Sequence, residues 1–443
     1  MKTLYAQLTA HLHATVQSLG DISPETLAAV VLEAPREAAH GDLATNAAMV
    51  LAKPFAEKIK GGPRAIAEAL KAPLAAYPAV QSIEIAGPGF INITLKPAAL
   101  LAEIGVIRAA PTQYAQLDIA AGHKAMVEFV SINPTGPIHV GHGRNAVFGE
   151  AIARMLQKAG YPVWREYLVN DAGNQINLLV QSLHARYSEL FGREKAVPEG
   201  GYGGAYLIEI AEKLKARDGE TWLDVTNDAE LFSGLRQFVV DECLAFIQAD
   251  LETLDIHFDN FFSEHAMHAN TTRMAEVVAK LRTMGLVYEG TLPPPKGKDI
   301  ADYKPVELTL FKATAFGLPE DQAVYNRRGQ PTYFGQDIAY HYDKLQRGHD
   351  VLVTVIGIDQ AGAFKPLAKA IEALTGRTDV YHPVPYEMVK VLRNGEPVKL
   401  SKRAGNIVLL SDVLAEVGPD AFRFAMLGVK PTTGLVFDLG KAV

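Results

Sequence analysis

The sequence predicts an α/β protein, in which a parallel-sheet domain carries a helical insertion and follows a separate N-terminal α+β domain. Three observations support this prediction. The chain has 443 residues, of which 48% are hydrophobic, so it can bury more than one core. Two strand-like runs flank a Gly-Pro-Gly turn before residue 106. A strand, a loop, a helix and a second strand then follow in order between residues 126 and 169.

The N-terminal α+β domain is predicted over residues 1–108. Helical patterns come first, and alternating apolar residues at 82–85 and 90–95 then predict two strands. The Gly-Pro-Gly sequence at 87–89 predicts the turn that connects them. Residues 109–124 contain both proline and glycine, and we expect them to link this domain to the next.

The most informative stretch of the chain follows this linker. Residues 126–130 are mainly apolar and predict a buried strand, whereas the Asn-Pro-Thr-Gly-Pro segment at 133–137 predicts a loop. Apolar residues recur at helical spacing from about His142, and Gly160 stands where the C′ residue of that helix belongs. A strand is predicted again at 161–169. This βαβ unit implies a parallel sheet with a ligand crevice at its carboxyl edge.

The βαβ unit opens a Rossmann-type domain that we expect to span residues 122–390. Helical patterns dominate 183–298, which we interpret as an insertion that ends in a proline-rich linker. Strand-like runs return at 306–311 and 351–358. Residues 391–443 are expected to form a loop and a helical connection.

Composition excludes several classes of protein and site. The net charge of -7 does not favour a generally basic surface, so any surface that binds nucleic acid must be local. The single cysteine, Cys243, excludes an internal disulfide and a cysteine-built zinc site, and we assign no metal ligand. No apolar run approaches the roughly 18 residues of a membrane span. We therefore expect a soluble cytoplasmic protein without a membrane partner.

The first motif with chemical meaning is a His-Val-Gly-His sequence at the start of the predicted crossover helix. A helix N-terminus offers unpaired amide groups and a positive dipole end, and both suit phosphate. His139 and His142 lie three residues apart and can face the same triphosphate, while Gly141 lets a flat base approach the backbone. The alternative is a pair of surface histidines beside a glycine that begins a helix. The position between a strand and a helix favours the phosphate site.

The second motif is the Lys-Leu-Ser-Lys-Arg sequence at 399–403. Fixed cations such as Lys399 and Lys402 suit a leaving pyrophosphate, because its negative charge grows as the bond to the α-phosphate breaks. A cluster of this kind is more often a solvated surface loop when it stands alone. In combination with the histidine motif, the pyrophosphate interpretation is favoured.

The buried strand that precedes the first motif carries an acidic residue, Glu128. An unpaired carboxylate inside an apolar strand costs several kcal/mol, so Glu128 needs a cationic partner. That partner is either a ligand or an internal arginine such as Arg144 or Arg165.

The paired motifs resemble the two signature sequences of class I aminoacyl-tRNA synthetases, and the segments around them resemble the arginyl-tRNA synthetase family. Similar segments occur in the catalytic part and in the N-terminal domain, at residues 40–46, 87–92, 127–137, 167–175 and 333–341. The resemblance runs from near the start of the chain to its last residues.

The resemblance implies an arginine pocket, because the residues that match Glu128, Asn133, Tyr333 and Asp337 line that pocket in the family. A guanidinium group presents five donors in a planar fork, so carboxylates on two sides can distinguish arginine from lysine. Tyr333 and Asp337 lie four residues apart, on one face if their segment is helical.

The resemblance also implies an ATP site, assigned to residues of both motifs and of one strand end: His139, Gly141, His142, Gly357, Asp359, Lys399, Ser401 and Lys402. One loop departs from the family. Many bacterial members have two histidines and a tyrosine after the aspartate that matches Asp359, whereas this chain has Gln360, Ala361 and Ala363. Since that loop helps to hold the nucleotide, its change bears on ATP affinity and catalytic competence.

The end of the chain is a second departure. Family members continue beyond residues 437–439 into an all-helical anticodon-binding domain, whereas this sequence ends at Val443. We expect tRNA recognition to depend on the N-terminal domain and on the surface near the acceptor end.

The function implied by the resemblance is that of an arginine–tRNA ligase, which uses ATP and Mg²⁺ to form arginyl-adenylate and then transfers arginine to tRNA. The catalytic residues would be His139, His142, Lys399 and Lys402. One alternative is an impaired or truncated paralogue that binds ligands or activates arginine for another acceptor. Another is a small-molecule nucleotidyltransferase, which would not explain the arginine pocket.

Overall fold

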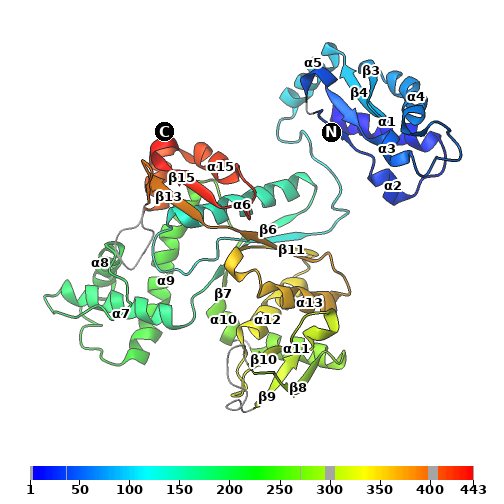
Figure 1. Ribbon diagram of the computed structural model, residues 1–443. Coiled ribbons are helices and arrows are strands. Elements are labelled where there is room, and N and C mark those ends of the chain that lie inside the picture. The colour runs from blue at the N-terminus through cyan, green and yellow to red at the C-terminus, as the bar shows by residue number, and fades with distance from the viewer. Residues whose placement is uncertain (1–2, 36, 270, 295–304, 398–407, 443) are drawn as a thin grey trace. The chain divides into compact units, whose positions relative to one another are not determined.

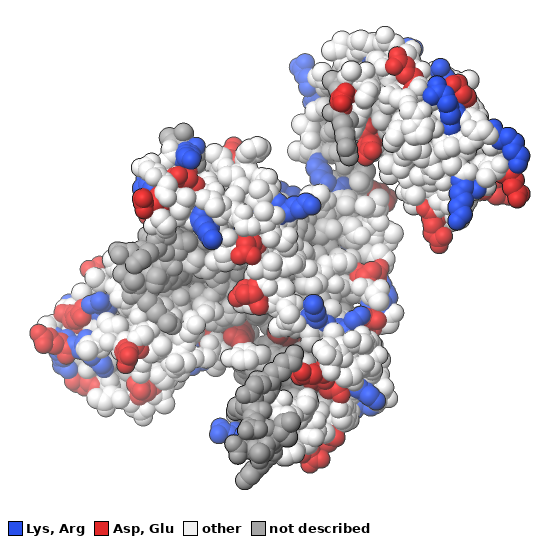
Figure 2. Space-filling view, viewed as in Figure 1, with Lys and Arg blue, Asp and Glu red and all other residues white. Residues whose placement is uncertain are grey.

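The computed structural model describes residues 3–35, 37–269, 271–294, 305–397 and 408–442 (Figure 1). The chain divides into two compact units, Met1–Asp118 and Ile119–Val443. Their boundary falls inside the predicted linker. On the face drawn in Figure 2, acidic and basic side chains are interspersed over each unit. No helix among these described residues is long and apolar enough to cross a membrane.

The N-terminal unit packs helices against an antiparallel sheet of four strands in the order β1-β2-β4-β3. The predicted strand pair is confirmed, with Ile83 opposite Ile93. The chain turns between these strands at Gly87 and Gly89, where φ is 52° and 149°. The elements are α1 (Leu4–Ser18), α2 (Pro24–Ala28), β1 (Leu32–Glu33), β2 (Leu43–Thr45), α3 (Ala47–Leu51), α4 (Gly62–Ala75), β3 (Val80–Ala86), β4 (Phe90–Leu95) and α5 (Pro97–Ala109).

The second unit is built on a parallel sheet of five strands in the order β12-β11-β5-β6-β7, which confirms the predicted fold class. Its strands are β5 (Ala125–Glu128), β6 (Val163–Val169), β7 (Asn260–Ser263), β11 (Val351–Gly357) and β12 (Tyr381–Tyr386). From β5 the chain crosses to β6, and from β11 it crosses in the other direction to β12. The topological switch point therefore lies between β5 and β11, where open parallel sheets bind their ligands.

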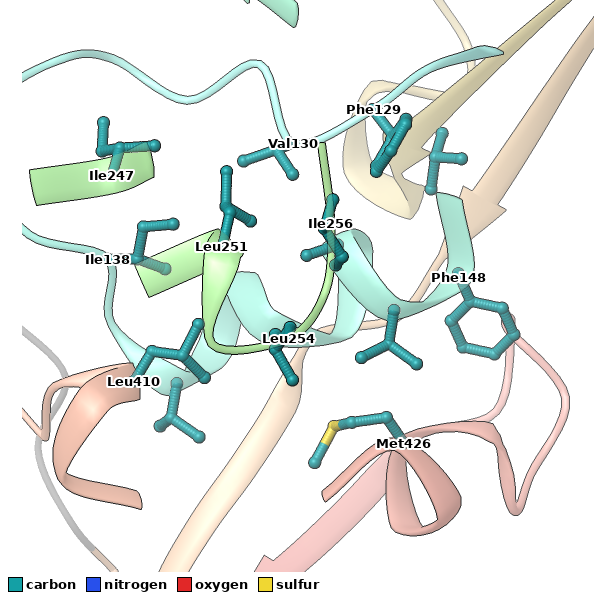
Figure 3. Packing of buried hydrophobic residues seen from close by; sticks show 14 of the residues in the cluster. Phe129, Val130, Ile138, Phe148, Ile247, Leu251, Leu254, Ile256, Leu410 and Met426 are labelled. Carbon is teal, nitrogen blue, oxygen red and sulfur yellow. The ribbon is translucent and has the colours of Figure 1, made fainter. Parts of the chain in front are cut away.

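The two faces of this sheet bury different helices (Figure 1). Val127 and Val353 pack in one core with residues of α6 (Val140–Lys158), whereas Met126 and Leu352 pack in another with α12 (Tyr333–Gln346) and α13 (Phe364–Thr375). This division follows from the alternation of side chains along each strand. Figure 3 shows part of the first core, in which Leu251 and Leu254 lie between Ile138 and Met426.

Helix α6 lies very close to the end of β5. A Cβ atom added to Gly149 would lie 2.1 Å from Cγ of Phe129, so a larger residue cannot occupy this position without displacing the ring. Both residues are buried. The glycine thus sets the distance between the helix that begins with the histidine motif and the strand that carries Glu128.

The predicted helical insertion at 183–298 is partly wrong. Helices α7 (Asn174–Glu189), α8 (Tyr206–Asp218) and α9 (Asp228–Glu252) do form a separate core. However, β7 then returns to the parallel sheet as the partner of β6. The sequence did not reveal β7 because this strand has four residues, all of them partly exposed, and shows no alternation.

A smaller α+β region follows β7 and precedes β11. It contains an antiparallel sheet with the order β10-β9-β8, and the strand predicted at 306–311 belongs to this sheet rather than to the parallel one. The elements are α10 (Glu264–Ala269), α11 (Thr271–Thr283), β8 (Val287–Thr291), β9 (Glu307–Phe311), η3 (Ala313–Phe316), β10 (Gln322–Tyr325) and α12.

The last segment is mixed rather than a purely helical connection. A sheet with the order β14-β13-β15 combines with three helices. The elements are β13 (Val389–Arg393), β14 (Glu396–Pro397), α14 (Leu410–Val417), α15 (Pro419–Leu427), β15 (Leu435–Asp438) and α16 (Leu439–Ala442). Asn394 and Gly395 form the hairpin turn with φ of 53° and 85°, as their sequence favours.

Candidate functional site

The loop that follows β5 begins with two residues in an unusual conformation. Val130 has φ of 64° and Ser131 has φ of 41°, a region that costs energy for residues other than glycine, and most of all for a β-branched one. The Val130 amide donates to Oδ1 of Asn145 at 2.6 Å, and Nδ2 of Asn145 donates to the Val355 carbonyl at 3.1 Å. Asn145 therefore ties the ends of β5 and β11 together at the switch point.

The same loop is also fixed from the side of β6. The Leu168 amide donates to Oγ of Ser131 at 3.1 Å, and Asn170 donates to the Ser131 carbonyl at 2.8 Å. The Tyr167 hydroxyl donates to the Ile132 carbonyl at 2.9 Å. Backbone strain that is held by this many hydrogen bonds is typical of a preorganised site.

The histidine motif lies where the sequence predicts it. His139 is the N-cap residue of α6, and His142 is in the first turn of that helix. Their rings stack with centroids 3.5 Å apart and an interplanar angle of 28°. Both residues are partly buried, and Gly141 between them is buried. The two imidazoles therefore stand together at the positive end of the crossover helix.

Lys399, Ser401 and Lys402 lie outside the described residues. The structure describes the chain again from Val408, and there it adjoins the first motif. The Val140 amide donates to the Val408 carbonyl at 3.2 Å, and the Leu410 amide donates to the Ile138 carbonyl at 2.9 Å. Backbone hydrogen bonds thus join the segment that follows the second motif to the start of α6.

Glu128 has an internal cationic partner, but neither proposed arginine supplies it. The partner is Lys344 of α12, whose Nζ lies 2.5 Å from Oε2 of Glu128. Glu128 is 5% exposed and Lys344 is 1% exposed. Both charges are therefore removed from water, and each requires the other.

The two arginines have other partners. Arg144 donates to three backbone carbonyls, those of Glu387, Lys430 and Thr433. Arg165 pairs with Glu150 at 2.8 Å. Arg144 thereby joins α6 to the segments next to β13 and β15, and its role is structural.

Helix α12 carries further predicted pocket residues. Because Tyr333, Asp337 and Lys344 are spaced four and seven residues apart, they lie along one face of this helix. Burial raises the pKa of Asp337 to about 7; the Glu128 carboxylate adds to the rise, Lys344 opposes it, and Glu264 adds to it. Glu128 and Asp337 therefore share one acidic environment between β5 and α12.

The other two predicted pocket residues are close in sequence to the first two: Asn133 follows Glu128, and Tyr333 precedes Asp337. Tyr333 is the first residue of α12 and is 85% exposed. Asn133 lies in the loop after β5 and donates through Nδ2 to Oε1 of Gln175 at 2.6 Å. The structure places Glu128 and Asp337 within range of electrostatic interaction, while Asn133 donates to a residue of α7 and Tyr333 faces solvent.

The predicted nucleotide loop is at the end of β11. Gly357 is the last residue of that strand, and Asp359 is exposed in the short turn η4 (Ile358–Gln360). A Cβ atom at Gly357 would lie 2.6 Å from Oδ1 of Asp359, so the glycine leaves room for this carboxylate. The end of β11 adjoins β5 across the switch point.

Sequence reasoning missed a second buried charge network beside Glu128. Glu166 of β6 is fully buried and accepts hydrogen bonds from Arg347, at 2.5 and 2.8 Å, and from the Tyr340 hydroxyl at 2.8 Å. Burial alone would raise the pKa of Glu166, but the Arg347 hydrogen bond and the Lys344 charge outweigh it and hold the pKa at about 2. An available signal was the helical spacing of Tyr340, Lys344 and Arg347 beyond Asp337.

Comparison with known proteins gives concordant matches. The family model "Arginyl tRNA synthetase N terminal domain" matches residues 6–95, and "tRNA synthetases class I (R), catalytic domain" matches residues 106–426. An arginine–tRNA ligase of Roseobacter denitrificans is 45% identical over 94% of this chain and 70% of its own length. One from Cereibacter sphaeroides is 46% identical over 94% and 71%. In fold, the Thermus thermophilus arginyl-tRNA synthetase has a TM-score of 0.70 at 20% identity, covering 99% of this chain and 78% of that one.

Proposed function

The chain belongs to the arginyl-tRNA synthetase family, as an ATP-dependent arginine–tRNA ligase of class I, and on this premise we propose which of its residues carry the reaction. The observation that carries the proposal is the acidic environment of Glu128 and Asp337 beside the switch point. The comparisons support the ligase and not a binding paralogue. The substrates are arginine, ATP and an arginine-accepting tRNA.

Arginine binds with its guanidinium group between Glu128 of β5 and Asp337 of α12. Carboxylates on two sides match the planar fork of donors, and a substrate without that fork leaves buried acceptors unpaired. Asn133 and Tyr333 complete the pocket from the loop after β5 and from the start of α12. The raised pKa of Asp337 supports this assignment, because a group held partly neutral in the free protein ionises when a cation arrives.

ATP binds across the switch point, with its phosphates at the start of α6 and its nucleoside toward Gly357 and Asp359. His139, His142 and the amide groups of the first helical turn face the phosphates. No group of three or more metal-ligating side chains occurs in the described parts of the chain. Mg²⁺ is proposed as the counterion that ATP brings with its phosphates.

The reaction is an in-line displacement. The arginine carboxylate attacks the α-phosphate, a new acyl–phosphate bond forms, and pyrophosphate leaves. His139 and His142 stabilise the charge that develops at the phosphate, and Lys399 and Lys402 receive the pyrophosphate. A hydroxyl at the 3′ end of tRNA then attacks the adenylate carbonyl, and AMP leaves. Positioning and electrostatic stabilisation account for catalysis, since no covalent enzyme intermediate is needed.

The test is arginine-dependent exchange of labelled pyrophosphate into ATP, measured with and without tRNA. Exchange that is lost in both Glu128→Gln and Asp337→Asn, with ATP binding retained, supports the pocket. Unchanged arginine KM in both variants would contradict it. Dependence of the exchange on tRNA would show that tRNA binding contributes to the activation step.

A further inference from the structure

A lysine is buried beside the pocket that is assigned to a cationic substrate. Lys344 is 1% exposed, its Nζ lies 2.5 Å from Oε2 of Glu128, and the same atom lies 4.1 Å from the ring centroid of Tyr340. A fixed positive charge repels a guanidinium at short range. Attraction of the substrate therefore does not explain why a lysine occupies position 344.

The number of charges supplies that reason. Glu128 and Asp337 are two carboxylates, and a guanidinium group carries one positive charge. Two carboxylates alone would leave one negative charge unpaired after arginine binds, which is unfavourable beside the buried Glu128. With the Lys344 ammonium group present and both carboxylates ionised, the pocket has one net negative charge, which one guanidinium neutralises.

We propose that Lys344 is a positioning and specificity-determining residue for arginine. It pairs with one oxygen of Glu128 and leaves the other oxygen, together with Asp337, to receive the guanidinium. Oε1 of Glu128 accepts a long hydrogen bond from Oγ of Ser131, at 3.5 Å, and can therefore form a stronger bond to a substrate donor. The inference rests on the proposed arginine pocket.

The position of α12 does not depend on Lys344 alone. One turn further along, Arg347 binds Glu166 of β6 through two hydrogen bonds, and the Tyr340 hydroxyl donates to the same carboxylate. Two neighbouring strands thus hold this helix through two ion pairs, one to each buried glutamate. Arg347 is consequently a matched control for Lys344, because it makes the same kind of pair but does not contact Glu128.

The test compares Lys344→Met with Arg347→Met in arginine-dependent pyrophosphate exchange. Lys344→Met should raise the arginine KM by about tenfold or more, while kcat and the ATP KM change by less than about threefold. Binding of citrulline, a neutral isostere of arginine, should be affected far less, so that the preference for arginine falls. Lys344→Arg should recover part of the loss because it restores the charge. Arg347→Met should lower the thermal midpoint without this selective change in the arginine KM.

Two further variants separate the possible failures. Glu128→Gln is measured in parallel: if it leaves the arginine KM unchanged, the pocket assignment itself is wrong. If Glu128→Gln raises the arginine KM and Lys344→Met leaves it unchanged or lowers it, the pocket stands and the role of Lys344 is overturned. The double variant Glu128→Gln, Lys344→Met removes both buried charges and should fold even where Lys344→Met does not. Its arginine KM should equal that of Glu128→Gln, and an additive increase would contradict the proposal.

Discussion

Oδ1 of Asn145 lies 2.6 Å from the amide nitrogen of Val130, and this hydrogen bond holds a β-branched residue at φ of 64°. Asn145→Ala should remove about 1–3 kcal/mol from the free energy of unfolding, because the buried amide loses its acceptor. It should also lower kcat/KM for arginine roughly tenfold, since the loop after β5 relaxes. Urea unfolding and pyrophosphate exchange measure the two effects.

The control for this prediction is Asn227→Ala. Asn227 caps α9 by accepting from the Ala229 amide at 2.9 Å, so its loss costs about 1 kcal/mol of stability in the insertion. Its kcat/KM for arginine should stay near that of the wild type. An equal loss of activity in both variants would mean that reduced stability alone explains the effect of Asn145→Ala.

Arginine affinity should depend on pH through Asp337. Burial raises its pKa to about 7, with Glu128 and Glu264 adding to the rise and Lys344 opposing it. Below that pH the free enzyme carries a proton that the guanidinium must displace, so the arginine KM should fall as pH rises from about 6 to 8. Asp337→Asn should flatten this profile, whereas a profile that survives in Asp337→Asn would exclude Asp337 as its source.

The same group has the opposite effect on the stability of the ligand-free protein. The folded state holds the Asp337 proton more tightly than the unfolded chain does, because its pKa is raised from 3.8 to about 7. Its contribution to stability should therefore decrease as pH rises from about 4 to 7. Urea unfolding of the ligand-free protein at several pH values between about 4 and 7, compared with Asp337→Asn, should show this decrease only in the wild type.

His142→Ala should lower kcat more than it changes the arginine KM. One donor removed from the developing charge at the phosphate costs roughly a hundredfold in rate. His257→Ala is a suitable control because His257 lies between α9 and β7 and its side chain is 66% exposed. Equal changes in kcat and in the arginine KM would argue against a role for His142 at the phosphate.

Lys402→Ala should likewise reduce turnover with little change in arginine affinity, because the pyrophosphate charge grows only as the bond breaks. Lys390→Ala, at an exposed position on β13, serves as the control for loss of an exposed positive charge. A Lys402→Ala variant with kcat and arginine affinity reduced to the same degree would refute the assigned role.

Gly149→Ala tests the close approach of α6 to β5. The added methyl group would overlap the Phe129 ring, and overpacking of this kind costs about 1–3 kcal/mol. The substitution Gly362→Ala is a matched control, because a Cβ there meets no atom within 4 Å. Denaturant unfolding of both variants should show a loss only for Gly149→Ala, and equal stability would mean that the two elements separate at little cost.

The sequence predicted those helices and strands that show a hydrophobic periodicity of their own. The βαβ unit from 126 to 169 follows from periodicity, and the C′ position of Gly160 marks the end of α6 correctly. The strand β7 was missed because its stability comes from pairing with β6, and four partly exposed residues have no periodicity of their own. Tertiary pairing decides such short strands.

In the candidate site, too, some features follow from local sequence spacing and others depend on long-range packing. The spacing of Tyr333 and Asp337 was sufficient to put them on one helix face. The need of Glu128 for a cation was also predictable from its apolar surroundings, but the identity of that cation was not. Lys344 is 216 positions away in the chain, and only the packing of α12 against β5 selects it over Arg144 and Arg165. Contacts of this range depend on the assembled fold, not on sequence spacing.

The hydrogen bonds that join Val140 to Val408 and Leu410 to Ile138 constrain how the length of this chain can vary in evolution. They anchor the downstream side of the lysine motif to the residues that begin α6. Residues inserted within α7–α9 lengthen the path between the two motifs without moving that anchor, and this helical region has a core of its own. Residues inserted between 402 and 408 would change the number of residues that separate these hydrogen bonds from the lysines of the second motif. Relatives should therefore tolerate insertions and deletions in the helical region and keep the short interval after the second lysine constant.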